Sequence, residues 1–181
     1  MKHTLLFLLM ICACTLQATA TGKQPRLTDD ELMTLVQKQT FRYFWDFAHP
    51  ESGLARERSN DRLEIATIGG SGFGVMAIIV GVERGFITRE QGAERLLKIV
   101  EFLNKADSYH GIWAHWMDGA TGKTIPFSRK DDGADLVESA FMFEGLLAAH
   151  QYFTHDNPTE NRIRGLINTC LLYTSPSPRD S

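Results

Sequence analysis

Residues 128–149 read SRKDDGADLVESAFMFEGLLAA, with four acidic side chains in the first half and a nearly unbroken apolar run after them. A helix that is apolar on nearly all sides is usually a buried one. We therefore predict a buried helix from about residue 132 to about residue 153, with carboxylates at its N-terminal end. The four acids are Asp131, Asp132, Asp135 and Glu138.

The spacing of three of these acids predicts a common face. Asp131, Asp135 and Glu138 stand at i, i+4 and i+7, and these positions share one side of a helix with 3.6 residues per turn. Acids in a first turn often only complement the helix dipole. That explanation fits Glu138 poorly, because an unpaired carboxylate inside an apolar run is costly. We therefore predict that the three carboxylates face a polar cavity.

A loop with two tryptophans precedes the acidic stretch, and we expect it to bind substrate. Trp113, His115 and Trp116 fall within residues 109–127, where Asp-Gly and Thr-Gly turn signals predict an extended, hairpin-like loop. An indole face can stack on a sugar ring while its N–H donates a hydrogen bond. The alternative is that both tryptophans fill the end of the core, since Trp is often largely buried.

Two charged residues complete the candidate substrate-binding set. Arg58 lies in a polar loop, residues 51–67, and loops of this length are often functional, although such charge runs also form solvated surface. Asp132 stands next to Asp131 in the acidic stretch. His115 has no partner at metal-ligand spacing, and the sequence has no H-E-x-x-H motif. We therefore predict no metal site and no cofactor.

Composition places the chain among ordinary globular proteins. It has 181 residues, of which 43% are hydrophobic and 23% charged, and its formal net charge is −3. This charge gives no reason to expect nucleic acid as a partner. Residues 21–169 contain no cysteine, so we expect neither disulfides nor a thiolate metal site there.

Residues 1–20 have the pattern of an export signal peptide. A short polar start precedes an apolar run at residues 5–12, and Ala18-Thr19-Ala20 matches an A-x-A cleavage signal. The run is too short to span a membrane. An alternative is a lipoprotein signal with a lipid anchor at Cys14. Both interpretations predict an exported protein, in the periplasm or at the cell surface.

The end of the chain differs in character from the rest. Residues 170–181 read CLLYTSPSPRDS and end in Ser/Pro turns. They resemble translated sequencing-adapter read-through, and a natural flexible tail is the alternative. We predict that the authentic sequence stops at about Thr169, so that residues 21–169 form part of one domain and residues 170–181 are not native.

The sequence predicts four further helices and little strand. Their ranges are 29–47, about 72–84 in and after the glycine-rich run IGGSGFG, 89–105, and about 159–167. Capping boxes open the first and third, at Thr28 with Glu31 and at Thr88 with Gln91. The first helix has an apolar side that we expect to face the core, with Leu32, Leu35, Val36, Phe41, Phe44 and Trp45. No βαβ alternation is visible, which favours an α/α array.

Two long runs in this chain resemble the bacterial glycoamylase-like family that includes endo-β-1,2-glucanases. They are ATIGGSGFGVMAIIVGVERGFITREQ, residues 66–91, and GIWAHWMDGATGKTIPFSRKDDGADLVESAF, residues 111–141. The resemblance covers about residues 32–169. It implies an all-α fold, the N-terminal part of an (α/α)6 toroid that is truncated here. It also implies export, hydrolysis of β-1,2-glucan or a related β-glucan, and functional carboxylates at Asp131, Asp135 and Glu138.

Glycoside hydrolysis needs a protonated acid at the leaving oxygen and a base or nucleophile on the other side of the sugar. Carboxylates along one helix line only one wall of a cleft, so we expect the opposing carboxylate to come from another helix. The resemblance implies at least one further functional acid downstream of this sequence. We therefore expect that this chain, as written, is not active by itself. The pattern leaves open which carboxylate is the acid and which the base.

Two other functions fit parts of the sequence. A polysaccharide lyase on a similar toroid would need a His or Tyr base and cationic neutralisation of a uronate, which the net charge and the acidic cluster disfavour. An exported sugar-binding α/α-repeat protein would share the tryptophans but would not need a row of buried carboxylates. We predict a monomeric glycoside hydrolase that acts on an oligo- or polysaccharide by general acid/base catalysis.

Overall fold

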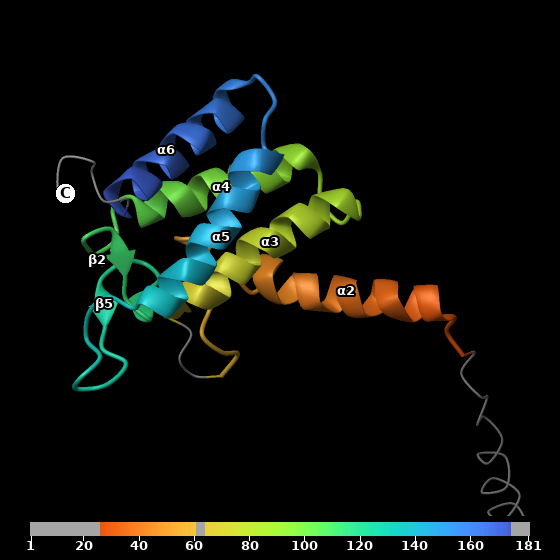
Figure 1. The fold of residues 1–181 in the computed structure, drawn as a ribbon. Coiled ribbons are helices and arrows are strands. Elements are labelled where there is room, and N and C mark those ends of the chain that lie inside the picture. Colours follow the sequence, from red (N-terminus) through yellow and green to blue (C-terminus); the bar gives the residue numbers. More distant parts are fainter. Residues whose placement is uncertain (1–25, 61–63, 175–181) are drawn as a thin grey trace, which may run out of the picture. The chain divides into compact units, whose positions relative to one another are not determined.

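The computed structural model describes residues 26–60 and 64–174, with side chains up to residue 171 (Figure 1). The predicted export signal, the predicted lipid anchor at Cys14 and residues 175–181 of the predicted tail lie outside these residues. The chain divides into two units, Met1–Thr34 and Leu35–Ser181. None of the helices in the described part is long and apolar enough to cross a membrane.

Helix α2 (Asp29–Trp45) begins in the first unit. The predicted capping box is confirmed there, because Glu31 N–H donates to Thr28 Oγ1 over 3.3 Å and Thr28 N–H donates to Glu31 Oε2 over 2.8 Å. Leu35 and Val36, both in the second unit, are exposed. The prediction that the apolar side of this helix faces the core is therefore wrong at these two positions. Apolar spacing shows which residues share a face, but not whether another element covers that face.

The second unit contains four further helices. In order along the chain they are α3 (Ile68–Glu83), α4 (Arg89–Leu103), α5 (Leu136–Tyr152) and α6 (Pro158–Thr174). Helix α3 packs mainly on α5, and α4 mainly on α6 (Figure 1). The second predicted capping box, at the start of α4, is confirmed. Helix α6 extends beyond its predicted end, and Cys170 is buried on it.

Short antiparallel strands join these helices and bring the candidate site together. One sheet contains β1 (Ile65–Thr67), β4 (Trp116–Asp118) and β5 (Thr124–Ile125), with β4 in the middle. The second is the hairpin of β2 (Ser108–Tyr109) and β3 (Ile112–Trp113). Because Thr67 pairs with Trp116, the residue before α3 lies beside the predicted substrate loop. The predicted hairpin-like loop is thus two short hairpins.

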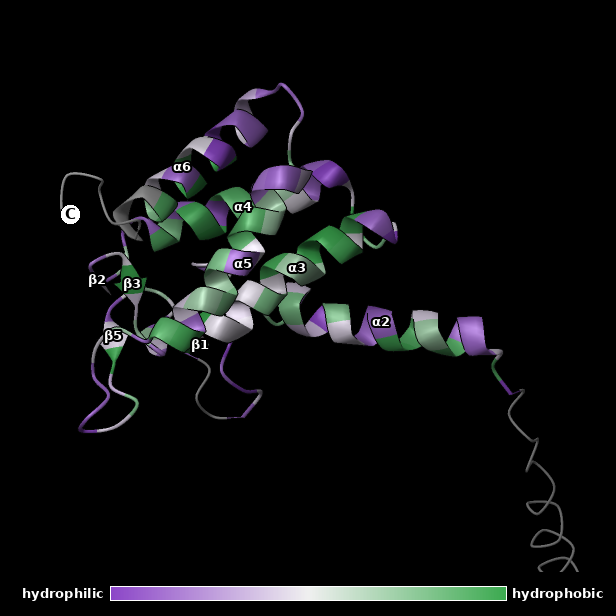
Figure 2. Ribbon diagram, viewed as in Figure 1, coloured by the Kyte–Doolittle hydropathy of each residue, from purple (hydrophilic) through white to green (hydrophobic). Residues whose placement is uncertain are grey.

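The hydrophobic core joins the four helices of the second unit. Each contributes at least one fully buried aliphatic side chain: Val75 from α3, Leu96 from α4, Leu146 from α5 and Ile163 from α6. Figure 2 shows hydrophobic residues along α3 and α5, the two helices with the most apolar sequences. The second unit therefore holds its helices, and the strands between them, around one apolar cluster.

Glycines allow the backbones of α3 and α5 to approach closely. A Cβ atom on Gly72 would lie 2.3 Å from Phe141 O, and one on Gly145 would lie 2.5 Å from Gly72 O. Both neighbours are backbone atoms, which cannot rotate away as a side chain can. This contact fixes the N-terminal end of α3 beside the start of α5, where the candidate carboxylates lie.

We expect Gly72→Ala to lower the free energy of unfolding by about 1–3 kcal/mol, because overpacking forces the backbones apart. Gly165→Ala on α6 is the matched control, since its Cβ would meet no described atom within 4 Å. Alanine favours a helix over glycine by about 0.5–1 kcal/mol, so the control should be neutral or stabilising. Urea unfolding of both variants measures the difference. If the two variants change the free energy of unfolding equally, the close approach of α3 and α5 does not require glycine at position 72.

Candidate active site

Asp135 ends the loop before α5 and caps that helix. Its backbone is extended, and its carboxylate accepts from the amides of Val137 at 2.9 Å and Glu138 at 3.0 Å. Its own N–H donates to Trp113 O over 2.8 Å, which ties the helix start to β3. The helix therefore begins at Leu136 and not near residue 132. An aspartate that captures the free amides of the first turn is a strong start signal.

Asp131 consequently lies on a turn and not on the helix, so the i, i+4, i+7 argument is wrong for it. The turn is closed by Phe127 N–H and Ser128 N–H, which donate to Asp131 O over 2.8 and 3.1 Å. It nevertheless brings Asp131 to the site. One ligand-type atom each of His115, Asp131 and Asp135 lies within 4.8 Å of the other two.

Glu138 reaches across to the N-terminus of α3. Its Oε2 accepts from Gly69 N–H over 2.8 Å and from the Thr67 hydroxyl over 3.2 Å. Thr67 is the N-cap of α3, and among the described residues its side chain makes no capping bond. A Cβ on Gly69 would lie 2.6 Å from Glu138 Oε2, so glycine makes room for the carboxylate. The positive end of the α3 dipole stabilises negative charge at this position.

His115 lies between the carboxylates of α5. Its Nδ1 is 3.0 Å from Asp135 Oδ2, and its Nε2 is 4.0 Å from Glu138 Oε1. The three side chains are 26%, 18% and 19% exposed, so the group is mostly buried but still reached by solvent. Burial raises the pKa of Asp135, but hydrogen bonds from the Glu138 amide, His115 and the Val137 amide outweigh it. The net pKa of Asp135 lies below its ordinary value, which keeps this carboxylate ionised at neutral pH.

The two tryptophans have different environments. Trp113 is 3% exposed, its Nε1–H donates to Leu103 O over 3.3 Å, and its ring lies 5.1 Å from that of Phe143. A buried indole offers no face to a sugar, so the substrate-binding prediction is wrong for Trp113 and the core alternative holds. Trp116 is half-buried, and its ring lies 4.7 Å from that of Phe127.

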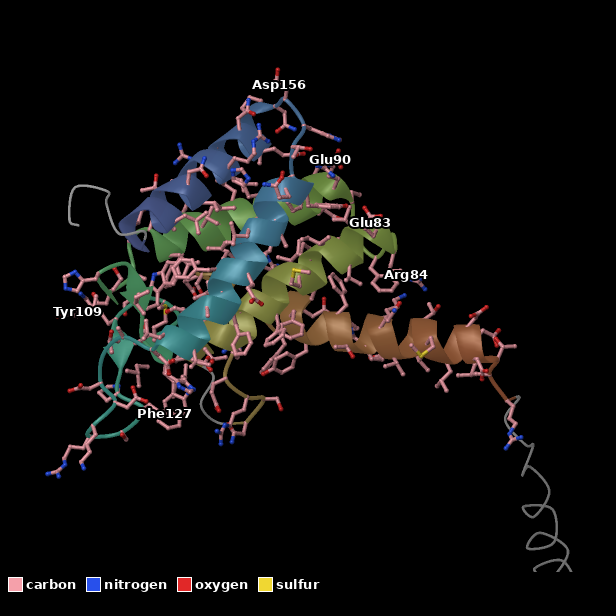
Figure 3. All side chains as sticks on the ribbon, in the orientation of Figure 1. Glu83, Arg84, Glu90, Tyr109, Phe127 and Asp156 are labelled. Atoms are coloured by element: carbon pink, nitrogen blue, oxygen red, sulfur yellow. The ribbon has the colours of Figure 1, made fainter. Side chains whose placement is uncertain are left out.

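Phe127 is a candidate that the sequence did not single out. It is 47% exposed, it stacks on His115 with ring centroids 4.3 Å apart, and it lies in the loop before α5 (Figure 3). Phe127 lies in a loop four residues before Asp131, and the sequence of a loop has no helix or strand period that could mark it as a site residue. The turn that carries Asp131 thus presents an aromatic face beside the carboxylates.

Arg58 and Asp132 stay predictions as substrate-binding residues. Arg58 is half exposed and pairs with its neighbour Glu57. Asp132 is exposed on the loop before α5. The prediction of no metal site also stays a prediction. His115, Asp131 and Asp135 are ligand types and are partly buried. His115 Nδ1 already contacts Asp135, and such a contact needs no ion.

The sequence matches no protein-family model. It is 53% identical over 143 residues to an exo β-1,2-glucooligosaccharide sophorohydrolase (non-reducing end) of Parabacteroides distasonis, a match that covers 78% of this chain and 20% of that protein. The chain therefore spans about a fifth of this curated relative.

Solved structures match the fold closely. An endo-β-1,2-glucanase from Chitinophaga pinensis, in complex with sophorotriose and glucose, gives a TM-score of 0.80 at 50% identity, over 82% of this chain and 37% of that one. A candidate glucoamylase from Bacteroides uniformis gives a TM-score of 0.82 at 72% identity. This match covers 87% of the present chain and 42% of the glucoamylase chain. The predicted all-α class, as part of an α/α toroid, is confirmed. The predicted resemblance is confirmed too: over most of its length this chain is similar to part of known β-1,2-glucan hydrolases.

Proposed function

We propose that the protein carrying this chain hydrolyses β-1,2-glucan or a related β-glucan by general acid/base catalysis. The observation that carries the proposal is the grouping of Asp131, Asp135 and Glu138 around His115, in a chain about half identical to β-1,2-glucan hydrolases. Glycoside hydrolases use carboxyl groups on either side of the scissile bond. The carboxylates at the start of α5 and on the turn before it would form one of these two sides.

The surroundings of the carboxylates support a division of roles. Glu138 accepts two hydrogen bonds at a helix N-terminus, and Asp135 accepts from two amides and His115. Both environments stabilise negative charge, which suits a base or a charge-stabilising group better than a proton donor. The proton donor is then Asp131 or a carboxyl group from an element that faces this wall.

Exposed apolar side chains support the proposal that activity requires more of the domain than this chain provides. Phe73, Met76 and Val80 on α3 and Phe141 on α5 are exposed, and the rings of Phe73 and Phe141 lie 5.2 Å apart. Contiguous exposed apolar surface is typical of a face that packs against another element. The solved relatives are more than twice as long as the part that matches, so they contain additional chain that could supply such elements and the opposing carboxyl group.

The two alternatives fit the site less well. A lyase must neutralise a uronate with cationic groups, whereas the imidazole here is surrounded by carboxylates. A sugar-binding protein would not need Glu138 fixed by two donors beside the Asp135 carboxylate. Release of reducing ends from β-1,2-glucan, other glucans and a polyuronate tests all three. Activity on β-1,2-glucan supports the hydrolase, an unsaturated product from the uronate would indicate a lyase, and binding without cleavage would indicate a binding protein.

Phe127 is the aromatic residue best placed to stack on a sugar ring beside the carboxylates. We expect Phe127→Ala to raise KM about three- to tenfold with little change in kcat, because an aromatic contact contributes about 0.5–1.5 kcal/mol. Tyr109→Ala is the matched control, since Tyr109 is 67% exposed on the β2–β3 hairpin (Figure 3). Initial rates over a range of glucan concentrations measure both constants. An unchanged KM would remove Phe127 from the substrate site.

We also propose that the protein is exported and acts as a monomer. The pattern of residues 1–20 supports export, by cleavage after Ala20 or by lipidation at Cys14. Fractionation of the producing cells tests the location, and replacement of Cys14 by serine distinguishes the two signals. A lipid-anchored protein would leave the membrane fraction on this replacement, whereas a protein with a cleaved signal would be unaffected.

A further inference from the structure

His115 connects the two helix starts that carry the site. Its backbone carbonyl accepts from Ile68 N–H over 3.2 Å, which anchors the residue to the first turn of α3. Its ring contacts Asp135, the cap of α5. Glu138 makes the reverse link, from α5 to Gly69 of α3. The imidazole is therefore held at the junction of α3 and α5 from both sides.

The orientation of the ring follows from its contacts. Because a carboxylate only accepts, His115 Nδ1 carries the proton and donates to Asp135 Oδ2 over 3.0 Å. The other oxygen of Asp135 is occupied by the α5 amides, so this carboxylate cannot turn away without uncapping the helix. Phe127 covers one face of the ring. Nε2 lies 4.0 Å from Glu138 Oε1, which is beyond hydrogen-bonding distance.

We propose that His115 is a positioning residue, which holds the Asp135 carboxylate in its orientation beside Glu138 and does not bind sugar. The inference rests on the proposed function for its effect on rate, and on the contacts above for its geometry. It replaces the substrate-binding role predicted from the sequence. Misplacing a catalytic group by about 1 Å can lower a rate about 10²-fold. Loss of the ring should therefore act on kcat and leave sugar binding nearly intact.

The kinetic test compares three variants in the protein that carries this chain. His115→Ala should lower kcat about 10²-fold with KM within about threefold of wild type. His115→Asn places an amide nitrogen near the position of Nδ1, so it should recover about tenfold of the lost rate. His115→Gln, which lacks a donor near that position, should not. His150→Asn, at the far end of α5, is the control and should match wild type.

A second measurement is independent of activity. In protein with ¹⁵N-labelled histidines, the His115 ring should show a protonated Nδ1 in slow exchange with solvent, and Asp135→Asn should abolish that signature. An unprotonated Nδ1 would overturn the proposed geometry, whether or not the protein hydrolyses glucan.

A rise in KM alone in His115→Ala would overturn the positioning role and favour sugar binding. Equal rates for the Ala and Asn variants would also overturn it. An inactive wild type with the Nδ1 signature intact would contradict the proposed function but not the contact.

Discussion

Replacing Glu138 by glutamine is expected to lower kcat on β-1,2-glucan by about 10²–10⁴-fold, the usual contribution of one acid or base group. The substitution removes the charge and keeps the shape. The amide oxygen of glutamine can still accept from Gly69 N–H and from the Thr67 hydroxyl, which Glu138 contacts at 2.8 and 3.2 Å. The N-terminus of α3 should therefore stay capped, and the loss should be one of chemistry and not of folding.

Two comparisons separate these effects. Glu144→Gln, an exposed position on the same helix, should leave kcat unchanged. Glu138→Ala should lose both the rate and part of the stability, because the α3 amide then loses its partner. Turnover is measured with the thermal midpoint of each variant. A Glu138→Gln enzyme with near wild-type turnover would show that Glu138 only caps α3.

Replacing Glu160 by alanine is expected to lower the free energy of unfolding by about 3–5 kcal/mol, because it leaves a partly buried arginine without its partner. The Glu160 side chain is 3% exposed and accepts two hydrogen bonds of 2.9 Å from Arg89. It also accepts from His155 N–H, and its own N–H donates to Asn157. Arg89 in turn donates to Tyr152 O at the end of α5. The pair therefore joins the start of α4, the end of α5 and the start of α6.

The contribution of Glu160 should depend on pH. Burial raises its pKa, but the hydrogen bonds from Arg89, His155 and Asn157 outweigh burial, and its net pKa lies below the ordinary value. A lowered folded-state pKa stabilises the protein above the ordinary glutamate pKa, and this stabilisation is lost as the pH falls through the folded-state value.

Urea unfolding should therefore show that Glu160→Gln has a lower free energy of unfolding than wild type at neutral pH. This difference in unfolding free energy should become smaller in acid. Glu94→Ala, an exposed acid on α4, is the control and should show a small effect at every pH. If the difference in unfolding free energy between wild type and Glu160→Gln does not change with pH, the ion pair does not stabilise the fold.

Much of the helical framework follows from local sequence, because caps and apolar periodicity are local signals. Thr28 and Thr88 open their helices as predicted. The start of α5 was predicted near residue 132 but lies at Leu136. The error arose because the turn at Asp131 and the N-cap at Asp135 are both aspartates, and either could open a helix. Asp135 decides between them only through its extended backbone and its bond to Trp113, which is a contact with a different element.

The candidate site was predicted only in part. The sequence indicated its acidic residues but not the hydrogen-bond partners that hold them in place. The partners of Glu138 lie some seventy residues earlier, at the start of α3, and no spacing rule connects them. The same limit explains Trp113 and Phe127. A buried and an exposed aromatic residue look alike in a loop, and tertiary packing decides which one faces solvent. Here the tryptophan fills the core and the phenylalanine faces solvent beside His115.

The most direct test of the proposed function is reducing-end release from β-1,2-glucan by the protein that carries this chain, with the 181-residue chain measured beside it. We predict release of short β-1,2-linked oligosaccharides by the former, loss of nearly all of this activity in Glu138→Gln, and no activity from the 181-residue chain. Hydrolysis at wild-type rates by Glu138→Gln, or no cleavage of β-1,2-glucan by the wild-type protein, would contradict the assignment of this site as a glucan hydrolase centre.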